Sequence, residues 1–166
     1  MPTTDIIIRP ARRDDLGALG RFGAVLLRTH HEFDRARFMA PGNDPEGGYA
    51  WFLGTQLGTP DARILVAERG GAIVGYVYVA IEPQSWKELR DEAGFIHDVI
   101  VDERARRSGA ATALLGAAVD WLRSRGVARV VLWTAHANAG AQRLFTRLGF
   151  RPTMIEMTRE LDDIRG

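Results

Sequence analysis

An arginine-rich turn with one glycine is the part of the sequence best suited to bind an anion. The turn comprises residues 104–111, RARRSGAA, and it leads into a segment of helical periodicity. A helix N-terminus presents backbone N–H groups without intrahelical acceptors and a partial positive charge, which together suit a phosphate group. Gly109 leaves room for an anion to approach the backbone, and Arg104, Arg106 and Arg107 add positive charge. The turn is therefore a predicted phosphate-binding site.

The same turn has a plainer interpretation, in which it is a solvated basic loop and Ser108 caps the helix that follows. The sequence motifs of two other nucleotide-binding turns are absent. No G-x-G-x-x-G follows a strand, and no G-x-x-x-x-G-K-[ST] occurs. A Rossmann dinucleotide site and a P-loop are accordingly not expected.

The spacing of apolar residues predicts the elements that must hold this turn. Two apolar runs flank Gly70 and Gly71 and predict an antiparallel hairpin. A loop is expected at 34–48 and a polar excursion at 82–93. Strands are predicted at 6–8, 64–68, 73–81, 95–101, 127–133 and 154–161, and helices at 12–31, 49–57, 109–126 and 138–148. This order predicts an α/β (α+β) fold, a mixed and mostly antiparallel sheet flanked by helices.

Composition limits the class of protein. The 166 residues suit one domain, and 46% are hydrophobic and 26% charged, as in ordinary globular proteins. A formal net charge of +1 speaks against a dedicated nucleic-acid binder. The chain has no cysteine, which excludes disulfides and thiolate chemistry, and we expect no metal site. No signal peptide and no membrane-spanning run are apparent, so a cytoplasmic protein without membrane partners is expected.

Two motifs at a fixed separation carry a resemblance to a known family. Residues 106–111 fit [QR]-x-x-G-x-[GA], and about thirty residues later comes N-x-x-A-x-x-L-F-x-x-x-G-F, residues 138–150. The combined pattern resembles the GNAT superfamily of acyl-CoA-dependent N-acyltransferases over roughly residues 94–151. The resemblance implies a single N-acetyltransferase domain over residues 1–166 that uses acetyl-CoA as co-substrate.

The resemblance also implies where the cofactor binds. The backbone of the turn would hold the pyrophosphate, and the preceding strand would bind the pantetheine arm through main-chain groups if it splays from the strand at 130–133. Asn138 matches a pantetheine contact, although asparagine is also an excellent helix N-cap. The cofactor-binding residues implied are Val99, Ile100, Val101, Arg106, Arg107, Ser108, Gly109, Ala110, Ala111, Thr112, Asn138, Leu144 and Phe145.

Amide formation requires a neutral amine, so a base helps at neutral pH. His97 is the first candidate base, with a structural role as the alternative, and Asp98 is the second candidate. Strand alternation predicts that Phe95, His97, Val99 and Val101 share one face and that Asp98 lies on the other.

The family's usual general acid is a tyrosine at the position of Phe145, which cannot donate a proton. Tyr78, Tyr76, Thr134 or water could serve instead, or the thiolate could leave unassisted, since thiols ionise near pH 8.5. Tyr78 is the preferred substitute, because its strand should lie beside that of His97. As an aromatic residue in an apolar strand, it also suits the core.

The binding site for the amine that accepts the acyl group is expected on the first predicted helix, the loop after it and the 82–93 excursion. Acidic and aromatic side chains there suit a cationic amine of a small molecule or peptide. The substrate-binding candidates are His30, His31, Glu82 and Trp86. A homodimer is a further expectation from the family. The alternative to an enzyme is a CoA-binding sensor or interaction module, which the absence of the family's tyrosine motivates.

Overall fold

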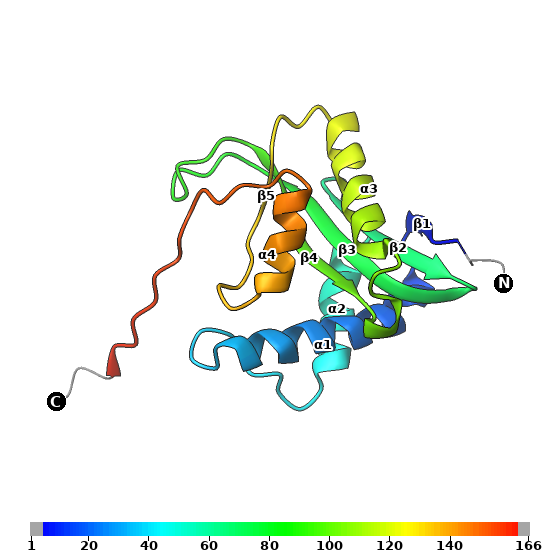
Figure 1. Ribbon diagram of the computed structural model, residues 1–166, viewed down its shortest axis with the longest axis horizontal. Helices are drawn as coiled ribbons and strands as arrows, with labels where there is room; N and C mark the ends of the chain where they lie inside the picture. Colours follow the sequence, from blue (N-terminus) through cyan, green and yellow to red (C-terminus); the bar gives the residue numbers. More distant parts are fainter. Residues whose placement is uncertain (1–4, 163–166) are drawn as a thin grey trace.

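A five-stranded sheet forms the centre of the computed structural model, which describes residues 5–162 (Figure 1). Its strands lie in sequence order, β1-β2-β3-β4-β5. The first three pairings are antiparallel, and β4 and β5 are parallel. The strands are β1 (Ile7–Pro10), β2 (Ala62–Arg69), β3 (Ala72–Glu82), β4 (Ala93–Val101) and β5 (Val130–Leu132). The predicted fold class and the β2–β3 hairpin are confirmed.

Helices cover both faces of the sheet (Figure 1). The two long N-terminal helices pack on one face around Leu19, Leu53 and Tyr76, and α3 packs on the other around Val77 and Leu114. The helices are α1 (Leu16–Phe33), α2 (Pro45–Gln56), α3 (Ala110–Ser124) and α4 (Ala139–Arg147), with short 3₁₀ turns η1 (Arg13–Asp15) and η2 (Glu103–Ala105). Among the residues described, no helix is long and apolar enough to cross a membrane.

Two glycines let α1 and α2 approach closely. A Cβ on Gly23 would lie 2.0 Å from Cδ1 of Tyr49, and one on Gly20 would lie 2.5 Å from the carbonyl oxygen of Glu46. Helix α2 begins earlier than predicted because the Asp44 side chain accepts a hydrogen bond from the backbone N–H of Gly47 and Pro45 occupies the first turn. The contact places Tyr49 against the sheet.

A β-bulge interrupts β4. Tyr78 lies opposite Asp98, but the next residue of β3, Val79, lies opposite Ile96. His97 is therefore an extra residue of β4 without a partner on β3, and such a bulge turns the following side chains.

The bulge overturns the prediction that His97 and Asp98 lie on opposite faces. The His97 ring contacts Tyr78, and Asp98 accepts a hydrogen bond from Tyr76, both on the face covered by α1 and α2. Val99 and Val101 pack on the other face, against the α3 side. Simple alternation fails here because it assumes a strand without an inserted residue.

The parallel pairing of β4 with β5 is short. It joins Gly94, Phe95 and Ile96 to Val130, Val131 and Leu132, and then stops. From His97 to Val101, β4 has a strand neighbour only on its β3 side within the described chain. The splay that the resemblance implies is thus present, and β5 is shorter than the predicted 127–133.

The predicted closing strand at 154–161 is wrong for the single chain. Residues 151–160 adopt no strand pairing, and the whole of 151–162 is exposed. In Figure 1 this segment leaves α4 and runs away from the body of the protein. The segment has the alternation of a strand, but it pairs with no strand among residues 5–162.

Candidate functional site

The arginine-rich turn has an unusual backbone. Arg107 has φ 65° and Gly109 has φ 83°, both in the left-handed region. Gly109 is the N-cap of α3, and no side chain caps this helix. The Ser108 hydroxyl instead donates to the carbonyl oxygen of Ala105. The interpretation of Ser108 as the cap is therefore wrong, since its hydroxyl holds the turn to η2.

The turn leaves backbone donors free at the start of α3. The first intrahelical bond runs from the N–H of Ala113 to the carbonyl oxygen of Gly109, 2.9 Å. The N–H groups of Ala110, Ala111 and Thr112 precede it and have no acceptor one helical turn earlier. Arg104, Arg106 and Arg107 are exposed around them. These donors and charges suit a phosphate group.

The open side of β4 leads from this turn to the start of α4. Asn138 caps α4, since its Oδ1 accepts the N–H of Ala141 at 3.2 Å. The capping role is confirmed, and its Nδ2 has no partner in the described chain. Gly149, at φ 92°, ends the helix region as predicted. Phe145 is buried against Phe150 and Leu144 is half-buried, so both belong to the core on the α3 side.

His97 is held by an acidic and two aromatic side chains. Its Nε2 lies 2.9 Å from Oε1 of Glu82, which was predicted to face the acceptor. Its ring stacks on Phe95, with centroids 5.3 Å apart, and lies 5.0 Å from Tyr78. The side chain remains one-third exposed. A Glu82 carboxylate can only accept, so in the neutral tautomer that makes this hydrogen bond Nε2 carries the proton and Nδ1 has a free lone pair.

Asp98 receives two phenolic hydrogen bonds. The hydroxyls of Tyr49 and Tyr76 both donate to its Oδ2, at 2.8 and 2.9 Å. Its Oδ1 has no hydrogen-bond partner among residues 5–162. Burial raises the pKa of Asp98, and the two tyrosine hydrogen bonds oppose that rise. The Oδ1 atom of Asp98 is thus available as a hydrogen-bond acceptor near the His97–Glu82 pair.

Tyr78 is poorly prepared to donate a proton. Its hydroxyl donates to Oε1 of Gln56 at 2.9 Å. Burial, with the nearby charges of Glu82 and Asp98, raises the pKa of Tyr78 to about 12. Its ring nevertheless packs against the His97 ring at an interplanar angle of 30°.

Three of the four predicted acceptor residues make no hydrogen bond to His97 or Asp98, although His30 lies near enough to Asp98 for its charged form to act on the pKa of that carboxyl. His30 donates from Nδ1 to the carbonyl oxygen of Leu26, 2.8 Å, and His31 binds that of Phe38, 3.1 Å. Trp86 is 84% exposed in the excursion. Only Glu82 contacts His97, so the structure does not bring the four together.

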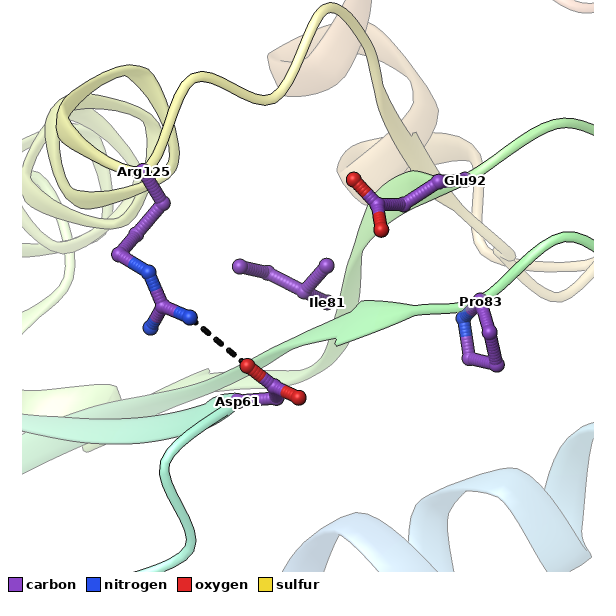
Figure 2. Close-up of a pocket in the computed structure, with 5 residues that line it drawn as sticks. All are labelled: Asp61, Ile81, Pro83, Glu92 and Arg125. Carbon is purple, nitrogen blue, oxygen red and sulfur yellow. Dashed lines mark hydrogen bonds and ion pairs between the residues drawn. The ribbon is translucent and has the colours of Figure 1, made fainter.

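A separate pocket lies at the far ends of β3 and α3, and none of the predicted site residues lines it (Figure 2). Arg125 reaches across it to Asp61, with Nη2 and Oδ1 2.7 Å apart. Its remaining lining residues are Ile81, Pro83 and Glu92. The one cationic side chain that lines this pocket is therefore paired within the protein.

Sequence reasoning missed Tyr49 and Gln56. Tyr49 is 49 residues from Asp98 and reaches it only because Gly23 makes room. Gly20 and Gly23, three residues apart in α1, indicate close packing with another helix, but the sequence does not show which helix that is.

Comparisons with known proteins agree with this arrangement. An uncharacterized N-acetyltransferase of Bacillus subtilis is 30% identical over 145 residues, covering 86% of this chain and 88% of the relative. A mycothiol acetyltransferase of Thermobispora bispora is 36% identical over 89 residues, which is 54% of this chain but only 30% of that protein. Among solved structures, an aminoglycoside N-acetyltransferase in complex with CoA shares the fold with a TM-score of 0.73, at 18% identity and 95% coverage of each chain.

A family model assigns the class directly. The model of the acetyltransferase (GNAT) family matches residues 27–150, which include β2 to β5, the turn and α4. The match spans most of the chain and both motifs. This chain therefore belongs to the GNAT family of acetyltransferases and is an enzyme of that class, an N-acyltransferase.

Proposed function

We propose that the chain, as one domain, transfers an acetyl group from acetyl-CoA to a primary amine of a small molecule or peptide. The amine attacks the thioester directly while both substrates are bound. One observation carries the proposal: β4 parts from β5 at Ile96, and the bulge at that point presents the His97–Glu82 pair. The open strand edge and a candidate base thus adjoin each other.

The cofactor would bind along the open side of β4. The turn of residues 106–112 would bind the pyrophosphate through the free N–H groups of α3 and the arginine charges. Backbone groups of Val99, Ile100 and Val101 on the β5 side would pair with the pantetheine amides, and the Asn138 amide would add a contact. The CoA complex of a similarly folded acetyltransferase supports this assignment.

His97 would act as the base through its free Nδ1, with Glu82 positioning the ring. As the amine nitrogen bonds to the thioester carbon, its proton passes to Nδ1. The tetrahedral intermediate then collapses, the C–S bond breaks and the CoA thiolate leaves. Because Phe145 has no hydroxyl and the Tyr78 proton is held by Gln56, departure relies on water or on the low basicity of the thiolate.

The acceptor is a cation at neutral pH before it loses its proton. Asp98 offers a free Oδ1, and the rings of Phe95 and Tyr78 offer aromatic faces beside His97. We therefore propose an ammonium-bearing acceptor that enters from the α1–α2 side, where His97 and Asp98 both point. The mycothiol and aminoglycoside named for relatives belong to those proteins.

A substitution of His97 tests the catalytic part. His97→Gln should lower kcat/KM at least about 100-fold, because general-base assistance is lost. Its affinity for CoA, measured by calorimetry, should not change. His136→Gln is the matched control, since His136 is exposed after β5. Activity is followed as thiol release from acetyl-CoA across a panel of amines and peptides.

The second candidate function is a CoA-binding module with little catalysis, which Phe145 favours. A protein that binds CoA but releases no thiol with any member of an exhaustive amine panel would establish it. A His97→Gln variant that stays active would instead support an enzymatic function but contradict the assignment of His97 as the general base.

A further inference from the structure

A continuous series of flat side chains begins on α2, crosses β3 and β4 and ends just after β5. Neighbouring rings in this ring series have centroids 5.0 to 6.0 Å apart. In spatial order the rings belong to Tyr49, Phe52, Tyr78, His97, Phe95 and Trp133. The candidate base lies inside the series, so a molecule that reaches it meets aromatic side chains on both sides.

The ring series is covered by protein near the base and open at its β5 end. Tyr78 and Phe95 are 6% and 5% exposed, whereas Trp133 is 70% exposed. The indole meets the Phe95 ring edge-to-face, with an interplanar angle of 87°, and this contact leaves most of its surface free. Single exposed apolar residues are common on proteins. Trp133 differs from them because it continues a series of rings that includes the candidate base.

Trp133 lies where β4 and β5 part. It follows Leu132, which is paired with Ile96 at the last step of the parallel ladder. If the same register continued by one residue, Trp133 would lie opposite His97, but the pairing stops there. Trp133 therefore adjoins both the base and the open side of β4 along which the cofactor would bind.

Charges of opposite sign lie at two points of the ring series. The carboxylates of Glu82 and Asp98 lie near His97, as described above. The guanidinium of Arg90 lies over the Phe95 ring, 5.2 Å from its centroid. An ammonium group is thus attracted toward the base, and the rings beyond it suit an uncharged group. An acceptor with one positive charge and an apolar body matches both.

We propose that the acceptor is a primary amine with a single positive charge and an aromatic ring on a short linker, and that Trp133 selects it by stacking on that ring. The ammonium would lie by His97 and Asp98, and the ring against the free surface of the indole. Aromatic pairs gain affinity beyond the burial of their area. Aliphatic amines lack the ring, and diamines bring a second cation toward Arg90. This acceptor class rests on the proposed acetyl transfer, since it specifies the amine.

The relative turnover of matched amines measures this selection. The kcat/KM for phenethylamine should exceed that for propylamine and for putrescine at least about tenfold, because a ring is buried and stacked. Trp133→Ala should lower this ratio at least about fivefold, and Trp133→Phe should retain most of it. Trp51→Ala is the matched control, since Trp51 is 72% exposed on α2 and is not part of the ring series. A ratio within one variant is independent of any general loss of activity.

Direct binding separates the acceptor class from the proposed reaction. In calorimetry of the protein saturated with CoA, phenethylamine should bind at least about tenfold more tightly than propylamine, and Trp133→Ala should remove the difference. If no amine released thiol, the proposed reaction would fail, and this difference in affinity would still decide the acceptor class. Equal kcat/KM and equal affinity for the three amines would overturn the acceptor class and leave the proposed reaction intact. A preference that Trp133→Ala retains, or that Phe52→Ala removes instead, would overturn the role of Trp133.

Discussion

Substitution of Gly109 by alanine separates backbone strain from cofactor binding. Gly109 has φ 83°, and a Cβ added there would meet no atom within 4 Å. The substitution therefore causes no clash within the protein. Its cost is that of a left-handed L-residue, about 1 kcal/mol in the free energy of unfolding. In a chain of this size that lowers Tm by about 2–4 °C.

The effect on CoA should be larger than the effect on stability. If the pyrophosphate lies against this backbone, the new methyl group occupies space that the anion needs. Loss of one charge-assisted hydrogen bond to a backbone N–H costs about 1.5–3 kcal/mol. The dissociation constant for CoA should then rise about 10- to 100-fold.

The same helix provides a matched control. Gly126, which follows the C-terminus of α3, has φ 74° and equally open space at its Cβ position. Gly126→Ala should cost a similar free energy of unfolding and leave CoA affinity unchanged. Gly109→Asn adds a second comparison, since asparagine tolerates the left-handed region but is larger than alanine. It should recover stability and lose still more affinity.

Calorimetric titration of CoA at one fixed ionic strength is the assay, because screening changes any phosphate contact. Urea unfolding supplies the stability of each variant. A Gly109→Ala protein that binds CoA as tightly as the wild type would refute the assignment of the pyrophosphate to this turn. Equal losses of affinity in Gly109→Ala and Gly126→Ala would attribute the effect to stability alone.

Three further substitutions test the packing and charge of the site. Gly23→Ala should reduce the free energy of unfolding by about 2–3 kcal/mol, because its Cβ would overlap the Tyr49 ring. Asp98→Asn still accepts both phenolic hydrogen bonds and loses a buried charge, so stability in urea should not fall. Its turnover of a cationic amine should fall at least about tenfold, with CoA affinity unchanged. Asp15→Asn should cost about 2–3 kcal/mol at pH 7, because its bonds to Arg9 keep the pKa of Asp15 below 3.8. That stabilisation is present above the unfolded pKa and is lost as the pH falls through the folded one, so urea midpoints of the two proteins should converge below about pH 3.8.

A different outcome would contradict each of these three predictions. Gly17→Ala lies in the same helix and faces only the end of Arg21, so it should stabilise the protein by up to about 1 kcal/mol. If Gly23→Ala did the same, Tyr49 would not be packed as described. If the Asp98→Asn protein were fully active, the Asp98 carboxylate would have no role in binding the amine acceptor. If the difference in urea midpoint between wild type and Asp15→Asn did not change as the pH falls, the Arg9–Asp15 ion pair would not account for the pH dependence of stability.

The sequence predicted features that depend on neighbouring residues. The turn before α3 follows from a glycine and arginines in one octapeptide, and the hairpin follows from Gly70 and Gly71, which have φ 59° and 80°. The cap at Asn138 and the terminator at Gly149 are equally local. Such elements are encoded within a few residues, so spacing alone locates them.

The acceptor side could not be predicted in the same way. The bulge at His97 depends on how β3 and β4 fit together, and no local residue marks it. The contact between Tyr49 and Asp98 depends on how closely α1 and α2 pack. The segment at 154–161 has the alternation of a strand, but pairing requires a partner, which a pattern in one chain does not supply.

One register shift connects the two halves of the site. Ile96 is the last residue of β4 paired with β5, and the next residue, His97, is the bulge. Phe95 and His97 share the α1–α2 face, as alternation predicts, and the inserted residue brings Asp98 onto that face as well. From His97 onward, the β5 side of β4 has no strand neighbour among the described residues. The end of the β4–β5 pairing and the grouping of His97 with Asp98 therefore coincide at one position, which is where the proposed reaction would bring the thioester and the amine together.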